Sequence, residues 1–310
     1  MAREQGAKSR GGAKRRGSTK VRGGTSAKII VPASTPQLSE LRESPVPATP
    51  RNGAFAPRTG ADQRGKYVYC VVHSEKPLTF GPIGIGIDPT EVHTVGFRDI
   101  AAVVSDTPIE LHEPTRQNVL AHERVNETVM QNHTVIPMSF GTVFKTREDI
   151  LQLLRSAYDA FKDVLVKMED KLEYGLKVLW DHERVVEALE RENEDIRRLK
   201  AEISSQHGST YFARMQYGRL VDAALQARSE HFVQAIFDEL RPVAVASRAN
   251  RPIGDKMIMN AAFLVRRDKE PDFDAAVKGI GAKYEHLTFK YTGPWPPYNF
   301  VNIRLKLERA

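Results

Sequence analysis

The sequence predicts an α+β protein with two ferredoxin-like sheet-and-helix domains, an inserted long helical hairpin and a disordered basic N-terminal tail. Three observations support this fold class. Runs with the two-residue alternation of β-strands are interleaved with runs that have helical spacing. From residue 171 the predicted order is strand, helix, strand, strand, helix, strand, which is the ferredoxin-like arrangement. The composition also changes near residue 65, where a basic, apolar-poor segment gives way to apolar strands.

The tail, residues 1–65, carries 13 of the 46 Lys and Arg residues but only 4 of the 39 Asp and Glu residues. Its net charge is therefore +9, whereas the rest of the chain is close to neutral at −2. Because the tail is rich in Pro, Gly and Ser and poor in apolar residues, we expect it to be disordered. No apolar run has the length of a secretory signal core or of a transmembrane helix. We therefore expect a soluble cytoplasmic protein with no membrane partner.

The first folded domain, residues 66–170, is predicted from three strand-like regions and two helices. The strand regions are Tyr67–Val72, a hairpin made by residues 92–96 and 100–105, and residues 134–144 with an interruption at Pro137. One helix is expected to open at Pro114 and run to about Gln131. The other begins at a capping box formed by Thr146 and Asp149, and its apolar positions continue at helical spacing to Met168.

The second domain, residues 171–310, begins with the period-two strand 172–180. The helical hairpin 183–240 follows, as two stretches, 183–206 and 210–240, that are split at His207 and Gly208. The apolar seam of the first stretch has the three-four spacing of a short coiled coil. The remaining predicted elements are strands at 243–247 and 257–266, a helix at 272–280 that ends at Gly281, and a strand at 286–291.

The sequence contains no recognisable active site. His122 and Glu123 begin an HE pair, but the zinc-protease pattern needs a second histidine where Asn126 stands. We interpret His122 as a hydrogen-bonded histidine at the edge of the core. Cys70 is the sole cysteine and lies in an apolar strand, which favours an inert thiol over a reactive one. We expect no enzymatic activity, no cofactor and no metal site.

Nucleic-acid binding is the main alternative function. A ferredoxin-like sheet also underlies the RNA recognition motif, and the tail contains RGG at 10–12 and 22–24. Phe140, Gly141 and Val143 match part of the aromatic strand of that motif, but Met138 and Lys145 do not match its basic and aromatic positions. Weak contact of the tail with polyanions needs no folded site, because contacts of Lys and Arg with phosphate are electrostatic and sequence-independent.

Several segments of the folded part resemble one known family, over roughly residues 66–302. They are YVYCVV at 67–72, RDIAAVVSD at 98–106, RQNVLAHERVNETVM at 116–130, TVIPMSFGTVF at 134–144, LEYGLKVLWD at 172–181, MIMNAAFLV at 257–265 and TGPWPPYNFV at 292–301. In this order they resemble the gas vesicle protein L/F (GvpL/GvpF) family.

The resemblance implies an accessory or minor structural protein of gas vesicle assembly, located in the cytoplasm and at the gas vesicle. The implied partner is the small, apolar shell subunit, and other gas vesicle accessory proteins are further candidates. We expect the protein to bind this subunit, before or during shell growth, through an apolar groove or a free sheet edge between its two domains. Such binding would prevent aggregation, because a subunit that faces gas on one side exposes a large apolar patch before incorporation.

The segment at 292–301 supplies the candidate site residues. Its prolines cannot continue a helix or donate to a β-ladder, and its aromatic side chains favour burial. We expect an extended strap pinned over a core, or a surface that contacts the partner. Loss of fold on Trp295→Ala would favour the strap, and an intact fold with lost binding would favour the contact. The candidates are Trp295, Pro297, Tyr298 and Phe300.

Overall fold

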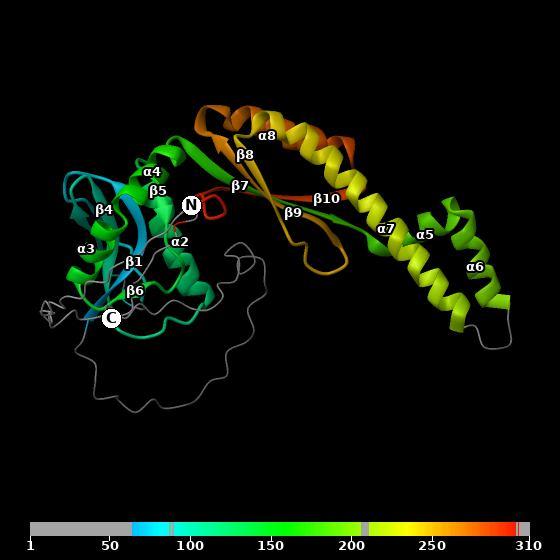
Figure 1. Cartoon of the computed structure of the whole chain (residues 1–310), viewed down its shortest axis with the longest axis horizontal. Coiled ribbons are helices and arrows are strands. Elements are labelled where there is room, and N and C mark those ends of the chain that lie inside the picture. Colours follow the sequence, from blue (N-terminus) through cyan, green and yellow to red (C-terminus); the bar gives the residue numbers. More distant parts are fainter. Residues whose placement is uncertain (1–63, 87, 89, 206–210, 302, 304–310) are drawn as a thin grey trace, which may run out of the picture.

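The structure is a computed structural model, and it describes residues 64–86, 88, 90–205, 211–301 and 303. Most of the tail whose disorder is expected from the sequence, residues 1–63, lies outside the described residues, as does the predicted split at His207 and Gly208. The described chain forms two antiparallel sheets with helices packed on them, which confirms the α+β class (Figure 1). The predicted domain boundary falls at Asp170, in the turn between the last helix of one unit and the first strand of the other.

The N-terminal sheet has the strand order β2-β3-β4-β1-β5, and β6 also pairs with β1. Its strands are β1 (Arg64–His73), β2 (Thr79–Pro82), β3 (Glu91–Phe97), β4 (Ile100–Pro108), β5 (Val135–Pro137) and β6 (Val143–Phe144). The β3–β4 hairpin confirms the prediction for residues 92–105. Among the described residues, four consecutive strands precede α2, so this domain shares the layered plan of a ferredoxin-like domain but has a different strand order.

Helices cover both faces of this sheet. α2 (Arg116–Met130) packs on one face beside Tyr67 and Val103, whereas α3 (Arg147–Ser156) and α4 (Tyr158–Met168) pack on the other beside Val68 and Val104. The capping box at Thr146 and Asp149 is present. The domain is therefore a three-layer sandwich with the sheet in the middle.

Two helix predictions in this domain need correction. The first helix does not open at Pro114, because the Thr115 side chain accepts a hydrogen bond from the Asn118 N–H and so acts as the N-cap of α2. The helix predicted to continue to Met168 is interrupted at Ala157, which has φ −114° and ψ 18°. The interruption separates α3 from α4, yet Leu154 and Phe161 on its two sides belong to one buried cluster.

The C-terminal sheet has the order β10-β7-β9-β8. Its strands are β7 (Lys171–Trp180), β8 (Ala246–Asn250), β9 (Met257–Arg266) and β10 (Leu287–Trp295). The connection from β7 to β8 contains α5 (His182–Glu192), α6 (Glu194–Ser205), α7 (Tyr211–Leu240) and the short η1 (Arg241–Val243). The connection from β9 to β10 contains η2 (Arg267–Lys269) and α8 (Glu270–Lys283). This connection pattern is the βαββαβ arrangement predicted from residue 171.

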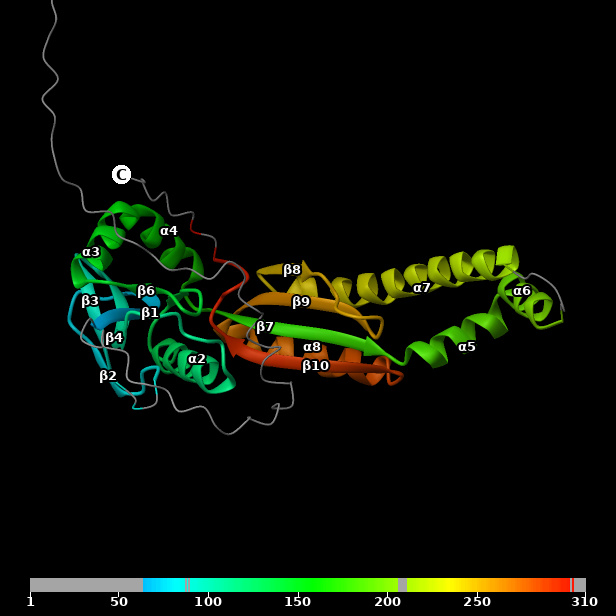
Figure 2. The same cartoon turned by 90° about the horizontal axis from the view of Figure 1, so that it is seen from below.

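Among the described residues, only one face of this sheet packs against helices. Tyr174 and Phe263 lie on that face together with Phe237 of α7 and Phe273 of α8. Both views show α7 and α8 on the same side of the sheet (Figures 1 and 2). We call the opposite side, which no described helix covers, the open face; it carries the alternate residues, which are mostly polar and include Glu173, Lys177, Arg248, Asn250 and Asn260, although Glu173, Lys177 and Asn260 are buried.

The helical hairpin differs from the predicted pair of helices. The first stretch breaks at Asn193, whose backbone is extended and whose Oδ1 accepts hydrogen bonds from the N–H groups of Asp195 and Ile196, at 3.0 and 3.2 Å. An asparagine that caps the following turn competes with continued helix, so α5 and α6 are separate. Leu189, Ile196 and Val221 hold the three helices together in a small cluster. We call α5, α6 and the outer part of α7 the arm, and it projects beyond the sheet (Figure 2).

Three further boundaries differ from the prediction. β8 begins at Ala246 because η1 occupies residues 241–243. α8 continues through Gly281 to Lys283, so Gly281 lies inside the helix and does not end it. β10 extends to Trp295, beyond the predicted end at Tyr291. None of the described helices is both long and apolar enough to cross a membrane.

Candidate functional site

The segment Pro296–Phe300, which we call the joint segment, lies between the two domains. It follows β10, and Pro296 and Pro297 are buried. The segment is a tight turn and not the expected extended strap: the Tyr298 N–H donates to the Pro296 carbonyl at 2.7 Å, and the Phe300 N–H donates to the Pro297 carbonyl at 3.1 Å. The turn directs consecutive side chains of the joint segment toward different domains.

Asn299 binds the C-terminal domain at one end of the open face. Its backbone N–H and its Nδ2 donate to the two carboxylate oxygens of Glu173, at 2.7 and 2.5 Å. The Asn299 carbonyl accepts from Arg248 Nη1 at 2.8 Å, and its Oδ1 accepts from Asn250 Nδ2 at 3.2 Å. The side chain and backbone of Asn299 thus connect β7 to β8, which lie on opposite sides of β9.

Glu173 is a buried carboxyl with an unusual acidity. Burial raises the pKa of Glu173 to about 7, against the hydrogen bonds from Asn299 and the charge of Arg248, which lower it. At this position desolvation therefore raises the pKa by more than the two hydrogen bonds from Asn299 lower it. The carboxyl that holds the joint segment changes its charge near neutral pH.

Tyr298 binds the N-terminal domain. Its hydroxyl accepts a hydrogen bond from Asn126 Nδ2 at 3.2 Å and lies 3.3 Å from His122 Nε2. Both partners are fully buried on α2. Burial also raises the pKa of the Tyr298 hydroxyl, so this group is neutral. Tyr298 and Asn299, neighbours in the sequence, therefore hold opposite domains.

His122 belongs to a polar row inside the N-terminal core. Its Nδ1 lies 3.0 Å from the Tyr67 hydroxyl, which itself accepts from the Gly141 N–H at 2.8 Å. Burial lowers the pKa of His122 to about 3, so the ring is neutral and offers one donor and one acceptor. The hydrogen-bonded interpretation of His122 is confirmed, although the ring lies in the core and not at its edge.

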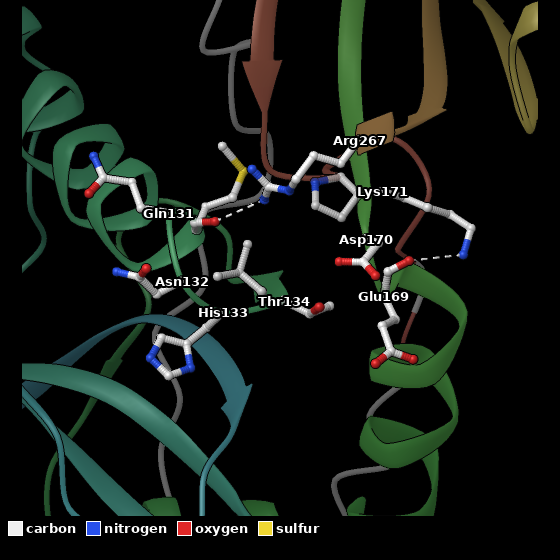
Figure 3. A pocket seen from close by; sticks show the side chains of 11 residues that line it. Gln131, Asn132, His133, Thr134, Glu169, Asp170, Lys171 and Arg267 are labelled. Atoms are coloured by element: carbon white, nitrogen blue, oxygen red, sulfur yellow. Dashed lines mark hydrogen bonds between the residues drawn. The ribbon is translucent and has the colours of Figure 1, made fainter. Parts of the chain in front are cut away.

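A cavity of about 310 Å³ opens beside the joint segment (Figure 3). The α2–β5 connection, the α4–β7 turn and η2 surround it. Arg267 joins these elements, because its backbone N–H donates to the Asp170 carbonyl at 2.8 Å and its Nη2 donates to the Met130 carbonyl at 3.1 Å. The lining residues are Met130, Gln131, Asn132, His133, Thr134, Val135, Glu169, Asp170, Lys171, Arg267 and Pro297.

The lining is mostly polar, so this cavity is not the expected apolar groove between the domains. The reason is that turns and helix ends form it, and such segments carry polar side chains and open backbone groups. Within the described residues there is also no group of three or more His, Cys, Asp or Glu side chains placed to hold a metal ion. The cavity is suited to polar contacts.

The structure brings two of the four candidate residues close together at the joint and leaves two near its margins. Tyr298 contacts α2, and Pro297 lines the cavity. Trp295 is half-buried, pairs with Glu173 in the β10–β7 ladder and donates from Nε1 to Thr292 Oγ1 at 3.2 Å. Phe300 is also half-buried. A partner contact by these residues stays a prediction.

Sequence reasoning missed Glu173, Asn299 and Arg267. Period-two patterning did place Glu173 on the strand face opposite the apolar residues, where a buried carboxyl is unexpected. The asparagine inside a proline-rich aromatic run was a second available signal, since Asn favours turns. Nothing local in the sequence identifies their pairing, because the two residues are 126 positions apart.

The segment that partly matches an RNA-binding strand is not available for base stacking. Phe140 is 2% exposed and packs edge-on against Tyr67 and His122. Val143 is buried as well. Sequence-specific RNA recognition by a sheet requires aromatic side chains on an accessible face. This segment belongs to the core.

Comparisons with known proteins agree on one class of protein. The crystal structure of the gas vesicle protein GvpF from Anabaena sp. PCC7120 superposes with a TM-score of 0.70 at 27% identity, over 78% of this chain and 99% of that chain. That of GvpF from Microcystis aeruginosa gives a TM-score of 0.67 at 26% identity, over 77% and 99%. The two-sheet architecture is thus shared with solved gas vesicle proteins.

Sequence relatives lead to the same class. Gas vesicle protein F of Streptomyces sp. CB03234 is 31% identical over 76% of this chain and 98% of its own length. Gas vesicle protein L1 of Halobacterium salinarum is 25% identical over 76% of this chain and 90% of its own length. The family described as gas vesicle synthesis protein GvpL/GvpF matches residues 65–302. This chain belongs to the GvpL/GvpF family.

Proposed function

We propose that this protein is an accessory or minor structural protein of gas vesicle assembly that binds the apolar shell subunit and prevents its aggregation before or during shell growth. The observation that carries the proposal is the family match over residues 65–302, which includes both sheets, the arm and the joint segment. The whole described fold, and not an isolated motif, is therefore what the family shares.

The physical problem that such a protein solves is exposure of apolar surface. A subunit with one side built to face gas is prone to aggregate until it is incorporated, because exposed apolar patches associate non-specifically. A second protein that covers the patch reversibly keeps the subunit in solution. Binding alone suffices for this task, so we propose a non-enzymatic role that requires no ATP and no cofactor.

Exposed apolar side chains on this protein support a binding role. Tyr211, Phe212 and Met215 stand at the outer end of α7, where Phe212 is 77% exposed. Large exposed aromatic groups are typical of protein interfaces. We propose that the protein acts in the cytoplasm and at the growing vesicle, with the shell subunit as its main partner and other accessory proteins as further ones.

The test is co-expression of the tagged full-length chain with the shell subunit, followed by nuclease treatment and purification without added ATP. We expect the subunit to stay soluble and to co-purify. An unrelated tagged protein of similar charge serves as the control for non-specific capture. Failure to co-purify, with no gain in subunit solubility, would contradict the proposal, and capture of nucleic acid alone would support the RNA-binding alternative.

A further inference from the structure

The sheet edges of the described chain differ in how they are protected; besides the two-residue, buried β6, they are β2, β5, β8 and β10. An unpaired edge strand exposes N–H and C=O groups that can pair with another chain, and proteins block such edges with proline, bulges or charges. β2 has a register shift before Gly81 and ends at Pro82, β5 ends at Pro137, and β10 has a register shift around Pro294. Each of these three edges carries at least one blocking feature.

β8 has neither a proline nor a register shift, and its one charged side chain, Arg248, donates to the Asn299 carbonyl. Its sequence, Ala-Ser-Arg-Ala-Asn, contains neither proline nor lysine, and all five residues pair with β9 in constant register. Most of the strand is exposed. Val245 and Ile253, on either side of β8, are 52% and 55% exposed. An added strand would therefore find both free backbone groups and apolar contacts here.

The side chains of β8 indicate the chemistry of the added strand. Ser247 and Ala249 pair with Phe263 and Ala261 of the core cluster, so this side would extend the apolar core. Arg248 projects on the open face. The following loop adds Arg251 and Lys256 but only one acid, Asp255, and within the described residues neither of these two cations forms an ion pair. The edge thus favours a strand that alternates apolar and acidic residues.

The same charges disfavour pairing of two copies of this protein. An antiparallel pair of β8 strands centred on the middle residue would place two Arg248 side chains opposite each other. Like charges at directly opposed positions of a ladder are destabilising. The occupant that the edge fits is therefore a different chain.

We propose that β8 is the docking edge for an extended segment of the shell subunit that carries an acidic residue among apolar ones. This inference rests on the proposed function and adds the surface and the binding mode. The segment continues the C-terminal sheet beyond β8, its apolar side chains lie next to Ala249 and Val245, and its carboxylate faces Arg248 or Arg251. Main-chain hydrogen bonds supply affinity in such complexes, and alternate side chains supply specificity.

The experiment compares full-length variants in the same co-purification. Ala249→Pro removes a backbone donor from β8, and Arg251→Glu with Lys256→Glu reverses the charge of its loop. Thr79→Pro, on the blocked edge β2, is the matched proline control. We expect Ala249→Pro to lower the recovered subunit at least about tenfold, the charge reversal to lower it about three- to tenfold, and Thr79→Pro to leave it unchanged.

Amide hydrogen exchange of residues 245–250, with and without the shell subunit, gives a direct measurement on the unmodified chain. Protection of these amides in the complex supports the proposal, and unchanged exchange in a formed complex overturns it. Undiminished recovery by folded Ala249→Pro also overturns it while leaving the proposed function intact. If that variant fails to fold, the charge reversal decides. No capture by the unmodified chain would refute the proposed function itself and the docking edge with it.

Discussion

The two sheets of this molecule are covered in different ways. The N-terminal sheet lies between α2 on one face and α3 with α4 on the other, and its edge strands carry prolines. Among the described residues, the C-terminal sheet has helices on one face only, and its edge strand β8 has neither a proline nor a register shift. Proteins that only need to be stable tend to cover such surfaces. The difference agrees with the proposed docking at β8, in which the N-terminal domain is a closed support and the C-terminal domain offers an edge to a partner.

The largest expected change in the free energy of unfolding comes from a substitution in the closed layer of the N-terminal domain. Phe161 is 1% exposed and packs between α4 and the sheet, so Phe161→Ala should lower the free energy of unfolding by about 3–5 kcal/mol. Urea denaturation of the full chain measures this value. Val166→Ala, on the same helix but 65% exposed, should change it by less than about 0.5 kcal/mol. Equal effects would mean that α4 does not seal the sheet.

The next prediction concerns the joint and pH. The pKa of Glu173 is raised from 4.5 to about 7, so the folded state binds more protons than the unfolded state between these values. The free energy of unfolding should therefore fall as pH rises from about 4.5 to about 7, by about 3 kcal/mol in total. Glu173→Gln should remove this component from melting curves recorded between pH 4.5 and 8. Parallel pH profiles of the two proteins would show that Glu173 titrates normally.

A smaller effect is expected on the other side of the joint. Tyr298→Phe removes the hydroxyl that accepts from Asn126 and lies beside His122, and it should cost about 1–2 kcal/mol. Chemical denaturation at neutral pH is the measurement. Tyr211→Phe, an exposed tyrosine at the end of the arm, is the matched control and should have almost no effect. A neutral Tyr298→Phe would indicate that the hydroxyl does not connect the domains.

The smallest effect should come from the arm. Phe212→Ala removes a ring that is mostly in solvent, so the free energy of unfolding should change by less than about 0.5 kcal/mol. The melting temperature of the full chain tests this. A marked loss of stability would show that the outer end of the arm packs on the protein itself, which would remove it from the surfaces available to a partner.

Local signals in the sequence predicted much of the fold. The alternation in residues 172–180, the capping box at Thr146 and the hairpin near residue 98 each depend on neighbours in the chain, and each is present. The break at Asn193 was missed because the coiled-coil spacing continues across it, while the competing cap involves only one side chain. Periodicity averages over many residues and does not detect such single events.

The joint could be predicted only in part. The aromatic and proline content of residues 292–301 marked the segment as unusual, but the turn that sends Tyr298 to α2 and Asn299 to Glu173 depends on contacts between distant elements. The polar cavity beside it was not predicted, because its walls come from segments that are not adjacent in the sequence. Such features follow from tertiary packing and have no local pattern.

The position of the joint segment in the chain also affects synthesis. A ribosome completes α4, the last helix of the N-terminal domain, well before it adds residues 296–300, so this domain can fold before the joint segment exists, whereas the last strand of the C-terminal sheet, β10, directly precedes that segment. Attachment of the two domains is then a late, intramolecular event, and its rate does not depend on protein concentration.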